Sequence, residues 1–199
     1  EKEPHGLDDR ILLAVREPQD LRQLVGPSWL EHASVNLTAL GSVSVLTLVT
    51  VLVVGYLLVT NKFHAATLLV CAAISGTALS YTLKFLVSRD RPQVVPHLAE
   101  ISDPSYPSGH SLLATVIYLT LAVILAQTVA SRRAKIYLVV AALFLAFVVG
   151  VTRVLIGVHY PTDVLAGWAA GTVWALFCWL LAEWLRDRGI WSPRTEGGF

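Results

Sequence analysis

Five long runs of residues without charge divide the 199-residue chain, and they restrict the folds that are open to it. A helix needs about 20 apolar residues to cross the roughly 30 Å hydrocarbon core of a membrane. Hydrophobic residues make up 55% of the sequence and charged residues only 15%, whereas soluble domains contain about 25% charged residues. The sequence therefore predicts an all-α integral-membrane helical bundle of five spans, over residues 33–60, 65–83, 111–131, 136–152 and 164–182.

The connections between the runs predict how the bundle is oriented. Residues 61–64 and 131–135 contain four basic side chains and no acid, and the start of the C-terminal tail adds two arginines. Such segments stay in the cytoplasm by the positive-inside rule. We therefore expect a multi-pass protein of the cell (inner) membrane whose opposite face meets the periplasm or exterior. The basic residues concerned are Lys62, Arg132, Arg133, Lys135, Arg186 and Arg188.

Residues 1–32 precede the first run and are too polar to form a span. An apolar face recurs at helical spacing over residues 7–15, opposite charged side chains, and a second short one covers residues 21–25. We expect two short amphipathic helices at the membrane interface. The predicted organisation is a single domain of residues 1–199, with this interfacial segment, a helical bundle over 33–185 and a cytoplasmic tail over 186–199.

The start of the chain predicts that the parent protein has an additional span. The sequence contains no methionine and begins Glu-Lys-Glu-Pro. Five spans with a cytoplasmic C-terminus leave residues 1–32 outside. An additional span upstream would return the N-terminus to the cytoplasm, so we expect a six-span parent protein.

Three polar clusters stand at the edges of the apolar runs: Lys84 to Pro92, Pro107 to His110, and Arg153 to Asp163. Because consecutive spans reverse direction, all three clusters emerge at one face of the membrane. An ionisable group at the centre of a membrane helix costs about 2.5–3.5 kcal/mol, so such groups are retained where they pair with one another or bind a ligand. Gathered cations and histidines predict a phosphate site, whereas snorkelling to the interface is the interpretation for Arg89 and Arg186.

The second cluster is typical of a loop that opens a helix. Ser108 is a good N-cap, and Gly109 allows a ligand to approach the backbone closely. The free N–H groups of a first helical turn bind anions. His110, in that turn, is expected to point at the same anion.

The third cluster places His159 four residues before Asp163. Pro161 and Thr162 between them favour a turn into the next helix, with Thr162 as a possible cap. An acid that is hydrogen-bonded to one imidazole nitrogen fixes the tautomer and leaves the other nitrogen free to attack. The spacing therefore predicts an oriented, nucleophilic histidine.

In this order, the patterns KxxxxxxRP, PSGH and TRxxxxxHxxxD resemble the three signatures of the type 2 phosphatidic acid phosphatase superfamily, in its membrane branch. The third signature usually opens with Ser-Arg, and Thr152 in this chain keeps the hydroxyl. The resemblance implies that His159 attacks phosphorus and becomes a phosphohistidine, that Asp163 orients it, and that His110 serves as acid and then as base. It also implies a phosphate cradle without metal or cofactor, made of Lys84, Arg91, Ser108, Gly109 and Arg153.

Membrane embedding and these motifs predict an integral-membrane, metal-independent lipid phosphatase that hydrolyses a phosphomonoester or a pyrophosphate. On family grounds undecaprenyl pyrophosphate is the first expected substrate, ahead of phosphatidylglycerol phosphate, phosphatidic acid and lipid A phosphate. Tyr106, beside the PSGH loop, is a possible pocket residue. The net charge of +1 gives no indication of a nucleic-acid partner.

Two other functional classes share parts of this pattern. Vanadate-dependent haloperoxidases use the same anion cradle, but they are soluble, and five spans argue against that class. A non-catalytic phospholipid-binding membrane protein needs only the cations. The presence of His110, His159 and Asp163 therefore favours an enzyme.

Overall fold

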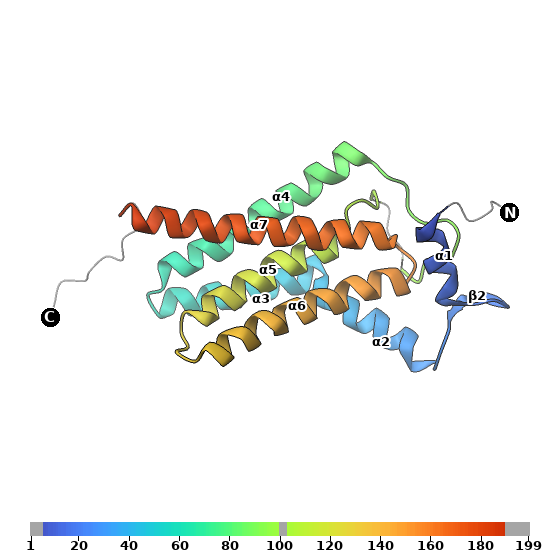
Figure 1. Cartoon of the computed structure of the whole chain (residues 1–199), viewed down its shortest axis with the longest axis horizontal. Helices are drawn as coiled ribbons and strands as arrows, with labels where there is room; N and C mark the ends of the chain where they lie inside the picture. The colour runs from blue at the N-terminus through green and yellow to red at the C-terminus, as the bar shows by residue number, and fades with distance from the viewer. Residues whose placement is uncertain (1–5, 100–102, 190–199) are drawn as a thin grey trace.

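The computed structural model describes residues 6–99 and 103–189, and helices make up most of this part of the chain. In chain order the elements are α1 (Leu7–Ala14), β1 (Arg16–Glu17), β2 (Asp20–Leu24), α2 (Trp29–Thr38), a 3₁₀ turn η1 (Ala39–Gly41), α3 (Val43–Val59), α4 (Phe63–Val87), α5 (Gly109–Ala126), α6 (Arg132–Leu155) and α7 (Pro161–Asp187). The long helices lie lengthwise beside one another, and α1, β2 and the loop after α4 gather at one end (Figure 1).

Four helices of the described chain, α4 to α7, are long and apolar enough to cross a membrane. The first predicted span, over residues 33–60, is two helices rather than one. In the structure α2 with η1 and α3 form a pair that is bent by 47°. The five predicted spans are therefore present when the bent pair is counted as one.

Gly41 and Ser42 explain the break between α2 and α3. Ser42 has an extended backbone, with ψ of 147°, and its hydroxyl accepts the N–H of Val45 at 3.3 Å. Gly41 packs tightly against α6 and the start of α5, where an added Cβ would clash with Cγ1 of Val149 and lie 3.3 Å from Cβ of His110. The bend thus lies at the level of His110, one of the predicted site residues.

The N-terminal segment has one short helix instead of the two that we predicted. Residues 16–24 form an antiparallel hairpin in which Arg16 faces Leu24 and Glu17 faces Asp20. The N–H of Val25 bonds to the carbonyl of Val15 at 3.1 Å and extends the pairing. A helix here would be too short to offset the cost of its first turn, whereas the hairpin satisfies the backbone directly. Residues 1–5 lie outside the described part.

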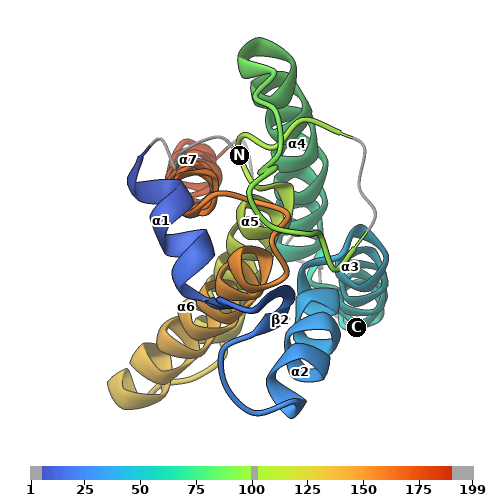
Figure 2. The ribbon, with the colours of Figure 1, turned by 90° about the vertical axis from the view of Figure 1, so that its right-hand side faces the viewer.

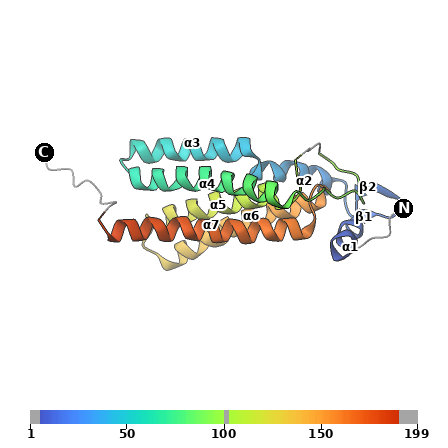
Figure 3. The ribbon, with the colours of Figure 1, turned by 90° about the horizontal axis from the view of Figure 1, so that it is seen from above.

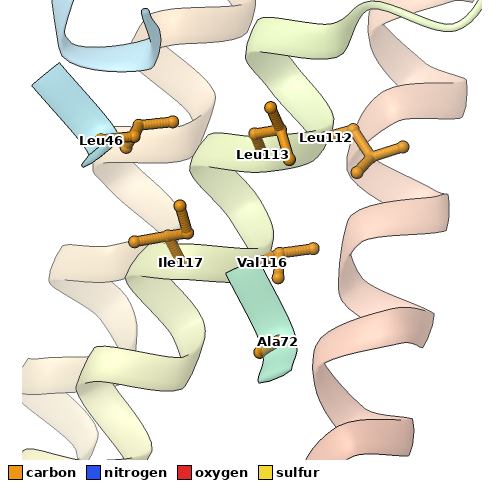
Figure 4. Packing of buried hydrophobic residues seen from close by; sticks show 6 residues of the cluster. All are labelled: Leu46, Ala72, Leu112, Leu113, Val116 and Ile117. Carbon is orange, nitrogen blue, oxygen red and sulfur yellow. The ribbon is translucent and has the colours of Figure 1, made fainter. Parts of the chain in front are cut away.

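α5 is the central helix of the bundle. It packs against α4, α6 and α7, as the view along the bundle in Figure 2 shows. Figure 3 gives the side view, in which α3 runs beside α4 along the edge of the bundle. The core cluster at α5, drawn in Figure 4, consists of Leu46, Ala72, Leu112, Leu113, Val116 and Ile117.

Two glycines bring α7 close to α5. An added Cβ would lie 2.8 Å from the carbonyl oxygen of Ser108 at Gly167, and 2.7 Å from that of Leu112 at Gly171. Small residues four positions apart let membrane helices approach in this way. As a result the start of α7 touches the start of α5, and the N–H of Ser108 bonds to the carbonyl of Asp163 at 3.0 Å.

The C-terminal boundary differs slightly from the prediction. α7 continues to Asp187, past the expected end of the bundle at residue 185. Its last turn contains Arg186, which pairs with Glu183. Residues 190–199 of the predicted tail lie outside the described part of the chain.

Candidate active site

The three polar clusters meet at the end of the bundle that carries α1 and the hairpin. Lys84 lies in the last turn of α4, and Arg153 lies in the last turn of α6. His110 is in the first turn of α5, and Asp163 is in the first turn of α7. His159 lies in the short loop between α6 and α7. The alternation of the spans therefore gathers these five side chains at one level.

His159 is enclosed by protein, with only 2% of its surface exposed. Its Nδ1 lies 3.5 Å from Oδ2 of Asp163, and its Nε2 lies 3.3 Å from Nη1 of Arg91. Burial lowers the pKa of His159 to about 4, because the charges of Arg153 and Arg91 add to the effect of burial and only Asp163 opposes it. The imidazole is therefore neutral at pH 7, with Nδ1 towards the carboxylate and Nε2 towards the cations.

Asp163 is fully buried, and both of its oxygens accept hydrogen bonds. Oδ2 accepts the N–H of Tyr160 at 3.0 Å, and Oδ1 accepts from Nη1 of Arg89 at 2.8 Å. The first of these bonds caps α7, which begins at Pro161 with Tyr160 as its N-cap. The expectation that Thr162 caps this helix is therefore wrong, since Thr162 lies inside the first turn. The two donors offset the cost of burying the charge.

Arg89 forms ion pairs with both Asp163 and Asp8. Neither Arg89 nor Asp8 was predicted as part of the site. Nη2 of Arg89 lies 3.0 Å from Oδ2 of Asp8, and Nη1 donates to Oγ1 of Thr162 at 2.8 Å. Asp8 also accepts the N–H of Thr162 at 3.1 Å. The guanidinium lies 4.0 Å from the ring centre of Tyr160. Arg89 therefore links α1 to the first turn of α7, and snorkelling is not its role.

Arg153 is a buried cation whose hydrogen bonds are incomplete. It is 2% exposed, and its Nη1 donates to Oγ1 of Thr38, at the end of α2, at 3.0 Å. Its Nε and Nη2 are buried and have no hydrogen-bond partner among the described residues. Burying an unpaired charge is costly, and an anion bound beside Arg153 would supply the missing acceptors.

The other two cations of the predicted cradle are paired with the loop that follows α4. Nζ of Lys84 lies 2.8 Å from Oδ2 of Asp103, and it also donates to the carbonyl of Pro104. Arg91 lies 2.9 Å from Oδ1 of Asp103 and donates to the carbonyl of Val158 at 2.7 Å. One carboxylate thus bridges Lys84 and Arg91.

The PSGH loop begins α5 as the sequence predicts, with Ser108 as its N-cap. The Ser108 hydroxyl accepts from the N–H of Ser111 at 3.4 Å and from its hydroxyl at 3.0 Å. Gly109 is the first helical residue, and an added Cβ would lie 3.3 Å from Oγ of Ser80 and 3.6 Å from Cε of Lys84. A contact of Ser108 and Gly109 with phosphate remains a prediction.

His110 and Tyr106 are both half-buried at this end of the bundle. The charges of Arg153, Asp103 and Lys84 act on the ring of His110. The hydroxyl of Tyr106 forms no hydrogen bond within residues 6–99 and 103–189. A role for Tyr106 in a pocket stays a prediction.

The composition of the site fits an anion. Four cations (Lys84, Arg89, Arg91 and Arg153), two histidines and the carboxylates of Asp103 and Asp163 converge there. No group of three or more His, Cys, Asp or Glu side chains suited to a metal occurs in the described residues. That catalysis needs no metal stays a prediction.

Comparison with known proteins identifies several similar sequences. The family model described as "PAP2 superfamily" matches residues 64–187. Phosphatidylglycerophosphatase B of Bacillus subtilis is 31% identical over 150 residues, which cover 74% of this chain and 73% of that protein. Lipid A 1-phosphatase of Rhizobium johnstonii is 30% identical over 107 residues (49% of this chain, 40% of that protein). Undecaprenyl-diphosphatase of Sulfolobus acidocaldarius is 28% identical over 114 residues (55% and 50%).

The fold also has a counterpart among solved structures. It is similar to the crystal structure of a transmembrane PAP2-type phosphatidylglycerolphosphate phosphatase from Bacillus subtilis, with a TM-score of 0.81 and 27% identity. The match covers 89% of this chain and 85% of the other. The helical bundle of the described chain is therefore that of an integral, multi-pass membrane protein.

Proposed function

Because this chain belongs to the PAP2 superfamily, we propose that it removes the terminal phosphate of a lipid through a covalent intermediate on His159. The class of enzyme, a membrane lipid phosphatase, is as predicted from the motifs. The observation that carries the proposal is Arg153, a buried cation with free N–H groups in the same site as a neutral, oriented histidine.

The first step is attack by Nε2 of His159 on phosphorus. Asp163, whose Oδ2 lies 3.5 Å from Nδ1, stabilises the imidazolium that forms as the N–P bond is made. The bond from phosphorus to the lipid oxygen breaks, and that oxygen takes a proton from His110, which enters the step as an imidazolium stabilised by the negative charge of the bound phosphate. The products of this step are the lipid alcohol, or the lipid monophosphate, and a phosphohistidine.

The second step is attack by water on the phosphohistidine. His110, left neutral by the first step, takes a proton from the water as its oxygen bonds to phosphorus. The N–P bond breaks, which restores His159 and frees inorganic phosphate. In both steps Lys84, Arg91 and Arg153 hold the non-bridging oxygens and offset their developing charge, a role that positively charged groups serve in phosphoryl transfer.

An apolar groove next to the site suits a lipid tail. It has a volume of about 400 Å³ and lies between α3, α4 and α5. Leu113, in its wall, follows His110 by three positions on α5, and Leu46 and Ile117 beside it are visible in Figure 4. The groove is therefore within reach of a substrate whose phosphate lies at His159, and its other lining residues include Val43, Thr47, Thr50, Val51, Val70 and Thr77.

A panel of lipids in detergent tests the proposed function. We expect release of inorganic phosphate from phosphatidylglycerol phosphate, undecaprenyl pyrophosphate, phosphatidic acid or lipid A 1-phosphate, and at least tenfold slower release from glycerol phosphate, which lacks a tail. Similarity to phosphatidylglycerophosphatase B of Bacillus subtilis favours phosphatidylglycerol phosphate. Undecaprenyl pyrophosphate is the substrate expected from the sequence. Activity is expected to survive EDTA. No release from any lipid would reject the function, and loss in EDTA would reject metal independence.

The orientation of the site is a separate proposal, supported by the basic loops between α3 and α4 and between α5 and α6. We propose that the site faces the periplasm or exterior. In a background with Cys71 and Cys178 replaced by alanine, Gln93→Cys should react with a membrane-impermeant maleimide in intact cells. Ser131→Cys, at the opposite end of the bundle, should react only after permeabilisation, and the reverse pattern would invert the topology.

A further inference from the structure

Asp103 occupies the position between two of the three cradle cations. Its Oδ2 lies 2.8 Å from Nζ of Lys84 and its Oδ1 lies 2.9 Å from Nη2 of Arg91. Nε of Arg91 also donates to the backbone carbonyl of Asp103 at 2.8 Å. A phosphate group is also bound through two oxygens that each contact a cation. Asp103 therefore contacts Lys84 and Arg91 in the way that a bound anion would.

The exposure of these side chains indicates which of them can move away. The side chain of Asp103 is 48% exposed, whereas those of Lys84 and Arg91 are 8% and 9% exposed. Burial alone would raise the pKa of Asp103, but the hydrogen bond and charge of Lys84 and the charge of Arg91 outweigh it and hold the pKa below its usual value. Asp103 is therefore an ionised carboxylate that reaches buried cations from the solvent side.

We propose that Asp103 is a specificity-determining residue, which keeps phosphodiester lipids out of the cradle by competing with their single negative charge. The inference rests on the proposed function, since a lipid phosphatase works in a bilayer made mostly of phosphodiesters. Their headgroups meet the same face as the site and outnumber any phosphomonoester substrate.

The competition follows from charge. A phosphodiester carries one negative charge, as Asp103 does, so exchanging one for the other gains no net attraction to Lys84 and Arg91. Asp103 is tethered at a high effective concentration and wins an equal exchange. A phosphomonoester carries about 1.5 to 2 negative charges at pH 7, and a diphosphate carries more. Such a group gains attraction when it displaces Asp103, and it also reaches the free N–H groups of Arg153.

Asp103→Asn tests the inference, because it keeps the shape of the side chain and removes the charge. Hydrolysis of phosphatidic acid is measured in detergent micelles that contain increasing phosphatidylglycerol, a phosphodiester with one charge. We expect phosphatidylglycerol to raise the apparent KM of Asp103→Asn about tenfold and to change that of the parent less than twofold. The inhibition constant of inorganic phosphate should also fall in the variant.

Two further variants separate the charge at this position from other effects. Asp103→Glu keeps the carboxylate and should resist phosphatidylglycerol as the parent does. Asp90→Asn removes the same charge from an exposed side chain that forms no ion pair within the described residues, and it should also behave like the parent. Equal sensitivity of Asp103→Asn and Asp90→Asn would overturn the inference.

Phosphate release tests the proposed function, and anion binding tests the role of Asp103 separately. A parent that releases no phosphate from phosphatidic acid or from any other lipid of the panel contradicts the function. Calorimetric binding of phosphatidylglycerol needs no turnover, and tighter binding by Asp103→Asn than by the parent is expected even then. Unchanged binding, or a lower kcat of Asp103→Asn without tighter anion binding, would overturn the inference and limit Asp103 to holding Lys84 and Arg91 in place.

Discussion

Replacing His159 with asparagine is expected to lower kcat/KM for lipid phosphate hydrolysis by a factor of roughly 10³ or more. The proposed nucleophile is Nε2, and asparagine offers no nitrogen that can carry a phosphoryl group. Asparagine does keep a polar group beside Asp163, which is fully buried and would otherwise lose a partner. The change therefore removes the chemistry with the smallest disturbance of the fold.

Phosphate release gives the size of the loss, and trapping of the intermediate gives its cause. With substrate labelled at the terminal phosphate, rapid quenching at alkaline pH should leave label on the parent protein and none on His159→Asn. His32→Asn, a change at an exposed histidine of α2, is the matched control and should keep full activity. Undiminished release or retained label in His159→Asn would remove His159 from the role of nucleophile.

The neutral state of His159 also bears on stability at low pH. Its pKa is about 4 in the folded protein and about 6.5 in an unfolded chain. As the pH falls from 6.5 towards 4, the unfolded state takes up a proton that the folded state does not, so the folded state loses stability. The thermal midpoint of His159→Asn should therefore fall less between pH 7 and pH 4.5 than that of the parent, if it is measured in the same detergent.

The parts of this fold that sequence predicts well are those determined by local composition. An uncharged run of about 20 residues has few alternatives to a membrane helix, so α4 to α7 were foreseen. The motifs were equally informative, because Lys84, His110, Arg153 and Asp163 each stand within one turn of a helix end. Because consecutive spans run in opposite directions, these four residues lie at the same end of the bundle.

The parts that sequence did not predict depend on contacts between distant segments. Asp8 lies 154 positions from Thr162, and nothing near it in sequence indicates that it meets Arg89. Arg89 occupies an unspecified position of the first motif, so its contact with Asp163 was visible only in three dimensions. The hairpin over residues 16–24 was missed because a short apolar repeat fits both a helix and a strand. Gly41, at the break between α2 and α3, packs against Val149 of α6 and against His110, which are both distant from it in sequence.

Replacing His110 with asparagine should have an effect that depends on the leaving group. An alkoxide leaves phosphorus poorly unless it is protonated, so a lipid phosphomonoester such as phosphatidic acid should lose about 10³-fold in rate. The leaving group of a lipid diphosphate is itself a phosphate, which needs far less help. The variant should therefore still form the phosphohistidine from undecaprenyl pyrophosphate, and it should then stall because no base activates water.

Rapid-quench measurements separate these two steps. With undecaprenyl pyrophosphate, His110→Asn should release one equivalent of lipid monophosphate per enzyme in a burst, while labelled phosphate accumulates on the protein. With phosphatidic acid the same variant should show neither a burst nor labelled protein, and His159→Asn should show neither with both substrates. Equal losses on the two substrates without labelled protein would mean that His110 is not the acid and base of this site. Because His110 packs against Gly41 at the bend before α3, such a result would instead assign it to holding that bend against α5.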